Sequence, residues 1–140
     1  MKRTARSLPD TNIIIRYLIN DDPAPYAKAK EYFDKVKNGG HRAIILESVI
    51  AECIYVLMKI YKVPRDQAAG SLIDILRYKG IANDDQQELI RALTLFSEQG
   101  LDIVDCILCA KASARGDHLF TLDTDLNEAN EKSNEPAHRL

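Results

Sequence analysis

The sequence predicts an α/β fold in which short strands alternate with amphipathic helices. Three observations support this prediction: short segments suited to buried strands recur along the chain, helical periodicity fills the intervals between them, and no repeat or linker divides the 140 residues. Strands separated by helices pair in parallel through right-handed crossovers, with helices on both faces of the sheet. The expected architecture therefore has three layers, α/β/α.

The N-terminal third is expected to contain one strand and two helices. Residues 4–8 suit a first strand, and Pro9 fits only at its end because proline cannot donate to a neighbouring strand. A short helix is expected over 12–19, before a polar turn. Apolar side chains then recur at helical spacing over 25–37, and Asn38-Gly39-Gly40 ends that helix.

The middle of the chain is expected to hold one strand followed by two helices. The β-branched run 42–46 suits a buried strand, and Ser48 is placed to cap a helix that reaches Tyr61. Pro64 allows a new start, after which apolar positions through Leu76 mark the next helix.

The next segment is expected to hold a marginal strand and two helices. Residues 80–82 form the marginal strand, and Asp84 and Asp85 make a solvated turn before a helix whose apolar face runs to Phe96. A further helix is expected over 102–114, ended by Gly116.

The C-terminal segment closes the predicted sheet. Residues 118–122 are expected to form the fourth strand, directly before Asp123, and one helical turn is expected from Asp125. The tail 127–140 has almost no apolar side chains and is expected to fray. The chain is thus expected to form a single domain over residues 1–126 with a polar C-terminal tail.

The composition limits the classes of protein to which this chain can belong. Hydrophobic residues make up 46% and charged residues 29% of the chain, and no apolar run approaches the roughly 20 residues needed to cross a bilayer, which argues against a membrane protein. The basic N-terminus lacks the apolar stretch of a secretory signal, so a cytoplasmic location is expected. A net charge of -2 argues against a nonspecific polyanion binder.

The three cysteines are expected to be buried and reduced. Cys53, Cys106 and Cys109 all lie in apolar helical segments, and their odd number argues against a disulfide framework. Cys106 and Cys109 have CxxC spacing, but a second CxxC and a nearby histidine are missing from the sequence. Structural zinc is therefore not expected.

Four acidic residues lie far apart in the chain, each beside an apolar segment: Asp10, Glu52, Asp105 and Asp123. Carboxyl ends of parallel strands meet at one edge of a sheet, which would bring such residues together. Two like charges about 4 Å apart repel by roughly 4 kcal/mol at an effective dielectric near 20. The cluster therefore predicts a bound cation.

The type of ligand atom indicates which cation would bind and which reaction it would support. Carboxylates without histidine or thiolate partners suit Mg²⁺ or Mn²⁺, and a hard cation with open positions binds phosphates. Hydrolysis of a phosphoester follows as the reaction class. Two alternatives compete within the site: Glu47 for Glu52, and Asp102 for Asp105. Glu52 is preferred because it falls in an apolar stretch, and Asp102 is the better helix cap by position.

Four sequence segments in order resemble those of a PIN domain, and of the VapC-like ribonuclease toxins in particular. They are D-T-N before an apolar helix, A-E on an amphipathic helix, V-D-C-I-L-C-A-K-A and T-L-D-T-D-L. The resemblance spans residues 8–126. It implies a four- to five-stranded parallel sheet, Mg²⁺- or Mn²⁺-dependent endoribonuclease activity on RNA, a homodimer and an antitoxin partner that occludes the site.

The resemblance also implies roles for the four acids. Asp10 would be the central metal ligand, with Asp105 and Asp123 in the same metal sphere, and Glu52 would hold a second metal or orient the attacking water. The chain departs from the family pattern at Pro9, where an apolar strand usually continues. It also lacks a β-branched run suited to a fifth strand near the C-terminus.

Four polar residues are expected as accessories to the site. Thr11, Asn12 and Ser48 would orient carboxylates or water through hydrogen bonds, and helix capping is an equally good interpretation of each. Asp125 would be an accessory ligand or the cap of the last helix. Two other functions stay open: a catalytically silent PIN-like module that binds RNA or protein, and a phosphatase acting on a small phosphoester.

Overall fold

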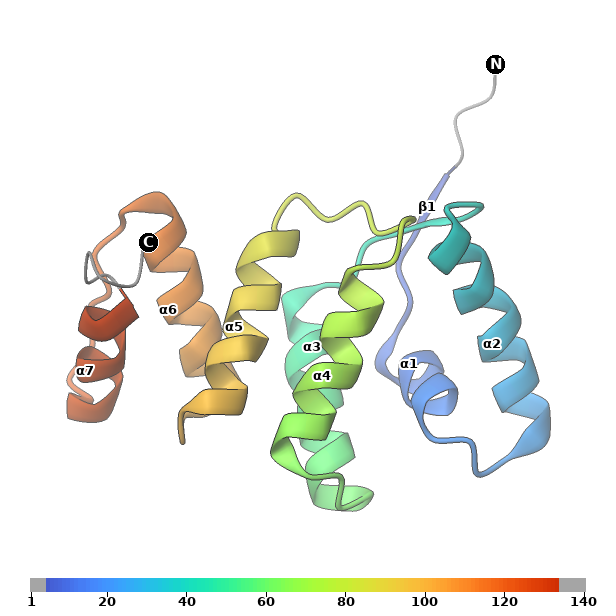
Figure 1. Ribbon diagram of the computed structural model, residues 1–140, viewed down its shortest axis with the longest axis horizontal. Coiled ribbons are helices and arrows are strands. Elements are labelled where there is room, and N and C mark those ends of the chain that lie inside the picture. Colours follow the sequence, from blue (N-terminus) through green and yellow to red (C-terminus); the bar gives the residue numbers. More distant parts are fainter. Residues whose placement is uncertain (1–4, 134–140) are drawn as a thin grey trace.

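The computed structural model describes residues 5–133 and is mainly helical (Figure 1). The elements are, in order, β1 (Arg6–Ser7), α1 (Thr11–Leu18), α2 (Pro23–Asn38), β2 (Arg42–Ala43), α3 (Glu47–Tyr55), the π-helical turn η1 (Val56–Ile60), α4 (Arg65–Leu76), α5 (Gln86–Glu98), α6 (Ile103–Arg115) and α7 (Thr124–Ser133).

The sheet is parallel, as predicted, but much smaller than predicted. Arg6 pairs with Arg42 and Ser7 with Ala43, and the backbone N–H of Ile44 donates to the Ser7 carbonyl at 2.9 Å. The marginal strand 80–82 is reduced to one parallel bridge between Ala43 and Ile81. Among the described residues, β1 is therefore an edge strand with β2 on one side only.

The predicted fourth strand, residues 118–122, does not form, so the predicted four- to five-stranded sheet is not present in the described part of the chain. Gly116 has a left-handed backbone (φ 67°), and the next backbone N–H, of Asp117, donates to the Ala112 carbonyl at 2.9 Å. This C-cap turns the chain back onto α6. Leu119 then packs against α6 and α7, far from β1.

Most helix boundaries lie within two residues of the predictions, but the helix expected to reach Tyr61 ends at Tyr55 and continues as η1, and two further features differ. Ser48 does not cap its helix, because the backbone is already helical at Glu47 and both Val49 and Ile50 donate to the Leu46 carbonyl at 3.0 Å. The predicted single turn from Asp125 is instead the ten-residue helix α7, which takes in the first part of the tail that was expected to fray. Residues 134–140 lie outside the described part.

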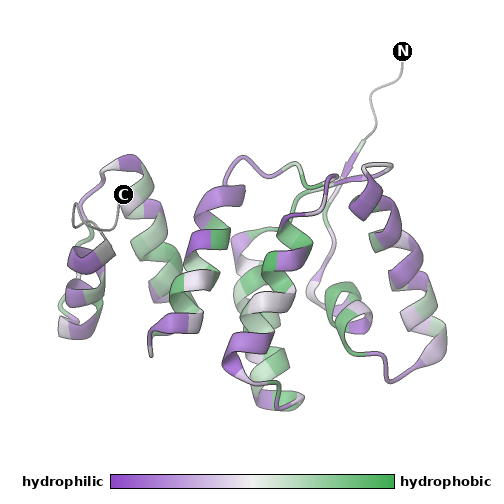
Figure 2. Cartoon of the chain, in the orientation of Figure 1, coloured by the Kyte–Doolittle hydropathy of each residue, from purple (hydrophilic) through white to green (hydrophobic). Residues whose placement is uncertain are grey.

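Most buried side chains belong to one core. Phe33 of α2 is fully buried and stacks on Tyr17 at 4.6 Å between ring centroids, with Tyr32 edge-on at 4.9 Å. Figure 2 shows hydrophobic residues concentrated on α1 and α3 and a mostly hydrophilic α7. All three cysteines are buried and free, as predicted.

A second, smaller core lies at the C-terminal end of the described chain and consists of Cys109, Ala112, Leu119 and Leu126. The helices stand in a row along the longest axis, with β1, α1 and α2 at one end and α6 and α7 at the other (Figure 1). Residues 117–133 therefore lie far from β1. No helix among the described residues is long and apolar enough to span a bilayer.

Candidate active site

Asp10 and Glu52 form the first half of the candidate site, beside the buried thiol of Cys53. Asp10 follows β1 and caps α1, since its carboxylate accepts a hydrogen bond from the Ile13 N–H at 3.0 Å. Glu52 is exposed on α3, so its carboxylate does not enter the core as the apolar stretch suggested. Burial, followed by the negative charges of Glu52 and Asp10, raises the pKa of Cys53 to about 12, although a hydrogen bond with Thr11 opposes the shift.

Asp105 and Asp123 form the second half. Asp105 lies in the first turn of α6, and its pKa is raised by burial first and then by the negative charges of Asp102 and Asp123. Asp123 follows the segment 118–122 and accepts a hydrogen bond from the Leu126 N–H at 3.1 Å at the start of α7. An acid with a raised pKa among other acids is a position where a cation would be favoured.

The structure brings the four acids together two by two and keeps the two halves apart. Within residues 5–133, no three histidine, cysteine or acidic side chains lie close enough to hold a metal ion. Asp10 stands at the end of the row that holds α1, and Asp123 at the end that holds α7. The described residues of one chain therefore do not supply the four-carboxylate set that the PIN resemblance implies.

The accessory residues divide in the same way. The Thr11 side chain makes a hydrogen bond to Cys53, and Asn12 is exposed on the first turn of α1, so both lie in the first half. Ser48 is exposed at the start of α3. Asp125 is exposed in the first turn of α7 and belongs to the second half.

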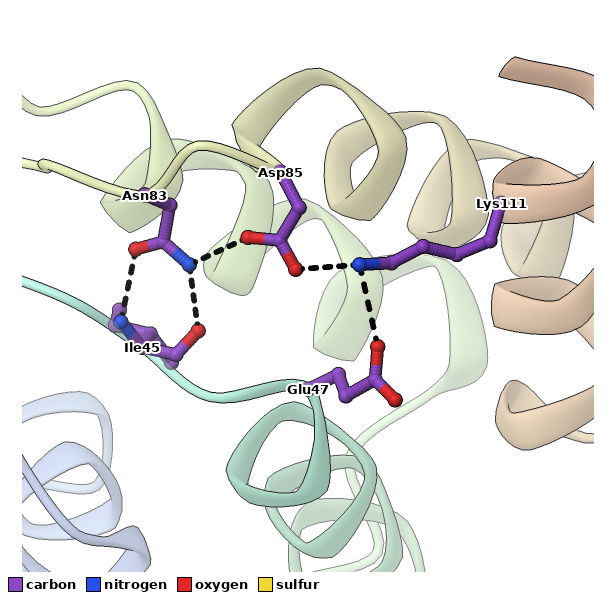
Figure 3. A network of polar contacts seen from close by, with 5 residues as sticks. All are labelled: Ile45, Glu47, Asn83, Asp85 and Lys111. Carbon is purple, nitrogen blue, oxygen red and sulfur yellow. Dashed lines mark hydrogen bonds and ion pairs between the residues drawn. The ribbon is translucent and has the colours of Figure 1, made fainter. Parts of the chain in front are cut away.

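A polar network that the sequence did not predict connects α6 with the start of α3 and with the segment before α5 (Figure 3). The Lys111 ammonium of α6 donates to the Asp85 carboxylate at 2.7 Å and lies 3.4 Å from the Glu47 carboxylate. Asp85 was expected in a solvated turn, yet it is held by Lys111. Glu47, the competitor of Glu52, is engaged in this ion pair.

Asn83 extends the network to the sheet. Its side-chain amide accepts from the Ile45 N–H at 2.9 Å, donates to the Ile45 carbonyl at 2.8 Å and donates to Asp85 at 2.9 Å. The Asn83 amide thus makes the two hydrogen bonds to the Ile45 backbone that a neighbouring strand would make if β2 continued. The only sequence signal was the Asn83-Asp84-Asp85 turn directly after the marginal strand.

The network predicts a pH-dependent contribution to stability. Burial raises the pKa of Asp85, but hydrogen bonds from Lys111 and Asn83 lower it by more in total, so the net shift is downward. A carboxyl with a lowered pKa contributes stability above its unfolded value of 3.8, and this is lost as pH falls through the folded pKa. We expect Lys111→Gln to reduce the free energy of unfolding by about 1 kcal/mol at neutral pH, and by less in acid.

Urea unfolding at pH 7 and pH 3 measures this difference. Lys30→Gln is the matched control, because the Lys30–Asp34 pair lies on the surface of α2 with both side chains about half exposed. Its loss of stability should be clearly smaller than that of Lys111→Gln, because solvent screens an exposed ion pair. Equal losses for the two variants at pH 7 would contradict a role for the network.

A comparison with protein families finds one that matches nearly the whole described chain. A family model described as PIN domain matches residues 7–132, a range that includes both halves of the candidate site. This chain belongs to the PIN domain family. The comparison with curated proteins and the comparison with solved structures found no match.

Membership of the PIN domain family places the fold in the α/β class and gives the protein a nuclease-like role. PIN domains typically bind RNA, and PIN-domain nucleases generally use divalent metal ions. Within one chain, the carboxylates as placed do not fit a shared metal centre.

Proposed function

We propose that this PIN-domain protein is a metal-dependent endoribonuclease that hydrolyses RNA phosphodiester bonds, and that it is the VapC-like toxin of a toxin–antitoxin pair. The observation that carries the proposal is the PIN match over residues 7–132, which spans Asp10, Glu52, Asp105 and Asp123. We assign catalysis and metal binding to these four carboxylates. Thr11, Asn12, Ser48 and Asp125 are proposed accessories.

The electrostatics of the second half support a need for a cation. The charges that act on Asp105 come from Asp102 and Asp123, and both are negative. An RNA phosphodiester would add another negative charge, and like charges repel. Mg²⁺ or Mn²⁺ would compensate these charges and prefers the oxygen ligands that carboxylates offer.

The metal dependence is the direct test. With structured RNA as substrate, we expect internal cleavage in Mg²⁺ or Mn²⁺ and none after EDTA treatment, and activity should return when either metal is restored. Labelling of the RNA at its 5′ end distinguishes internal cuts from removal of terminal nucleotides. Intact RNA at every metal tested would contradict the enzyme assignment, and release of phosphate from p-nitrophenyl phosphate without RNA cutting would favour the phosphatase instead.

A second candidate function has one observation in its favour. Because the four acids of a single chain form two separate pairs, a lone chain could bind RNA or protein without cutting it. This silent PIN-like module predicts binding of the same RNA without products. A cognate antitoxin, a homodimer and a cytoplasmic location are part of the toxin proposal and stay predictions.

A further inference from the structure

An apolar surface is left uncovered at the C-terminal end of the chain. Phe120 and Leu122 are 84% and 93% exposed, although residues 118–122 have the composition of a buried strand. Their backbone makes no backbone hydrogen bond to another residue that the structure describes. On the neighbouring helix α6, Val104 and Leu108 are also exposed, one turn apart. We call residues 118–122 the donor segment.

A matching surface is left uncovered at the other end. Among the described residues, the edge of β1 that faces away from β2 has no partner strand, and Leu8, directly after β1, is 63% exposed. A shallow groove of about 320 Å³ runs along this position and is lined by Ser7, Leu8, Pro9, Asp10, Ile13 and Tyr32. The groove therefore borders both the last residue of β1, Ser7, and Asp10.

The chain's own donor segment is held away from this groove. The Gly116 turn fixes it against α6, Leu119 is buried between α6 and α7, and the row of helices separates it from β1 (Figure 1). One chain thus carries both a strand without a partner and an edge without a strand. In two copies related by a two-fold axis, each donor segment could pair with β1 of the other copy. No unpaired segment or edge would then remain, so the assembly would close as a dimer.

We propose that two copies of this chain donate residues 118–122 to each other, each segment pairing in parallel with β1 of the other copy. Parallel pairing sets the carboxyl ends of the two strands side by side, so Asp123 of one copy lies beside Asp10 of the other. Each complete site then combines Asp10 and Glu52 of one chain with Asp123, and with Asp105 beside it, of the second chain. This inference rests on the proposed nuclease site for its functional consequence.

The oligomeric state tests the assembly without reference to activity. We expect the wild-type chain to sediment as a dimer and the double variant F120D/L122D to sediment as a monomer with an unchanged circular dichroism spectrum, since both side chains are exposed within one chain. Ile60→Asp is the matched control: Ile60 is 63% exposed on η1, outside the proposed contact, so its variant should stay a dimer. A wild-type monomer, or a dimer that survives F120D/L122D, would overturn the proposal.

Mixing two inactive variants tests the composite site. In a mixture of Asp10→Asn and Asp123→Asn chains that exchange freely, half of the dimers pair unlike chains, and each of these has one intact site out of two. Cleavage should therefore return to about one quarter of the wild-type rate. No return of activity, with an active wild type and two inactive parents, would overturn the shared site. An inactive wild type would count against the proposed function alone, and the sedimentation result would still decide the strand donation.

Discussion

Asp10→Asn is expected to lower the rate of RNA cleavage in Mg²⁺ or Mn²⁺ by about 100-fold or more, since the variant removes a full negative charge from the proposed centre of the site. The fold should be unaffected. Asp10 also caps α1 through the Ile13 N–H, and asparagine caps helices about as well as aspartate does. The substitution therefore separates the catalytic role from the capping role. Initial rates of cleavage and the urea midpoint, measured on the same preparation, check both parts.

Asp22→Asn is the matched control for Asp10→Asn. Asp22 occupies the N-cap position of α2, makes no side-chain capping bond and lies outside both halves of the candidate site. Its variant should cleave RNA at the wild-type rate. If the proposed toxin arrests bacterial growth, expression of Asp10→Asn should not. A fully active Asp10→Asn protein would remove Asp10 from the site and, with it, the reason to expect a metal beside β1.

Gly80→Ala is expected to destabilise the fold by about 3 kcal/mol or more. A Cβ atom at residue 80 would lie 2.0 Å from the His41 carbonyl oxygen and 2.6 Å from the Val36 carbonyl oxygen. Both are backbone atoms that cannot move alone. The Gly80 N–H also donates to Val36 at 2.8 Å, and its carbonyl accepts from Ala43 at 2.9 Å, so a shift would detach the Ile81 bridge from β2.

Gly70→Ala provides the opposite control on the neighbouring helix α4. Nothing lies within 4 Å of a Cβ added at Gly70, so alanine should stabilise the helix by about 0.5–1 kcal/mol. The free energies of unfolding of the two variants should thus differ in sign relative to the wild type. A Gly80→Ala protein as stable as the wild type would mean that the α2–β2 junction relaxes far more easily than its hydrogen bonds suggest.

Local signals in the sequence predicted the helices well. The left-handed C-caps at Gly39 and Gly116 end α2 and α6 where glycine predicted a stop, and Phe33 and Val36 are buried on the predicted face. These features depend on residues a few positions apart. The prediction of a strand at 118–122 was wrong because the apolar pattern of this segment is equally compatible with Leu119 packing on α6. Only long-range contacts decide between a strand and this packing.

The candidate site was harder to predict for the same reason. The sequence identifies which acids stand beside apolar segments, and the family match includes all four. The local sequence does not determine whether the segment that ends at Asp10 lies beside the segment that ends at Asp123. Asp10 and Asp123 each cap a helix, a role that any isolated strand–turn–helix would give them, so their local conformations say nothing about their separation. The ion pairs of Lys111 could not be predicted because its partners, Asp85 and Glu47, are distant in sequence.

The small core around Leu119 and Leu126 has a consequence for how the protein opens. Leu119 and Leu126 are held there by Cys109 and Ala112 of α6, whereas the other buried side chains of α6, Ala110 among them, belong to the main core. Amide hydrogens in such a small unit exchange through sub-global opening, at a free energy well below that of complete unfolding. Residues 117–133 should thus behave as a separate foldon, which can detach from its resting position while α1 to α6 stay folded.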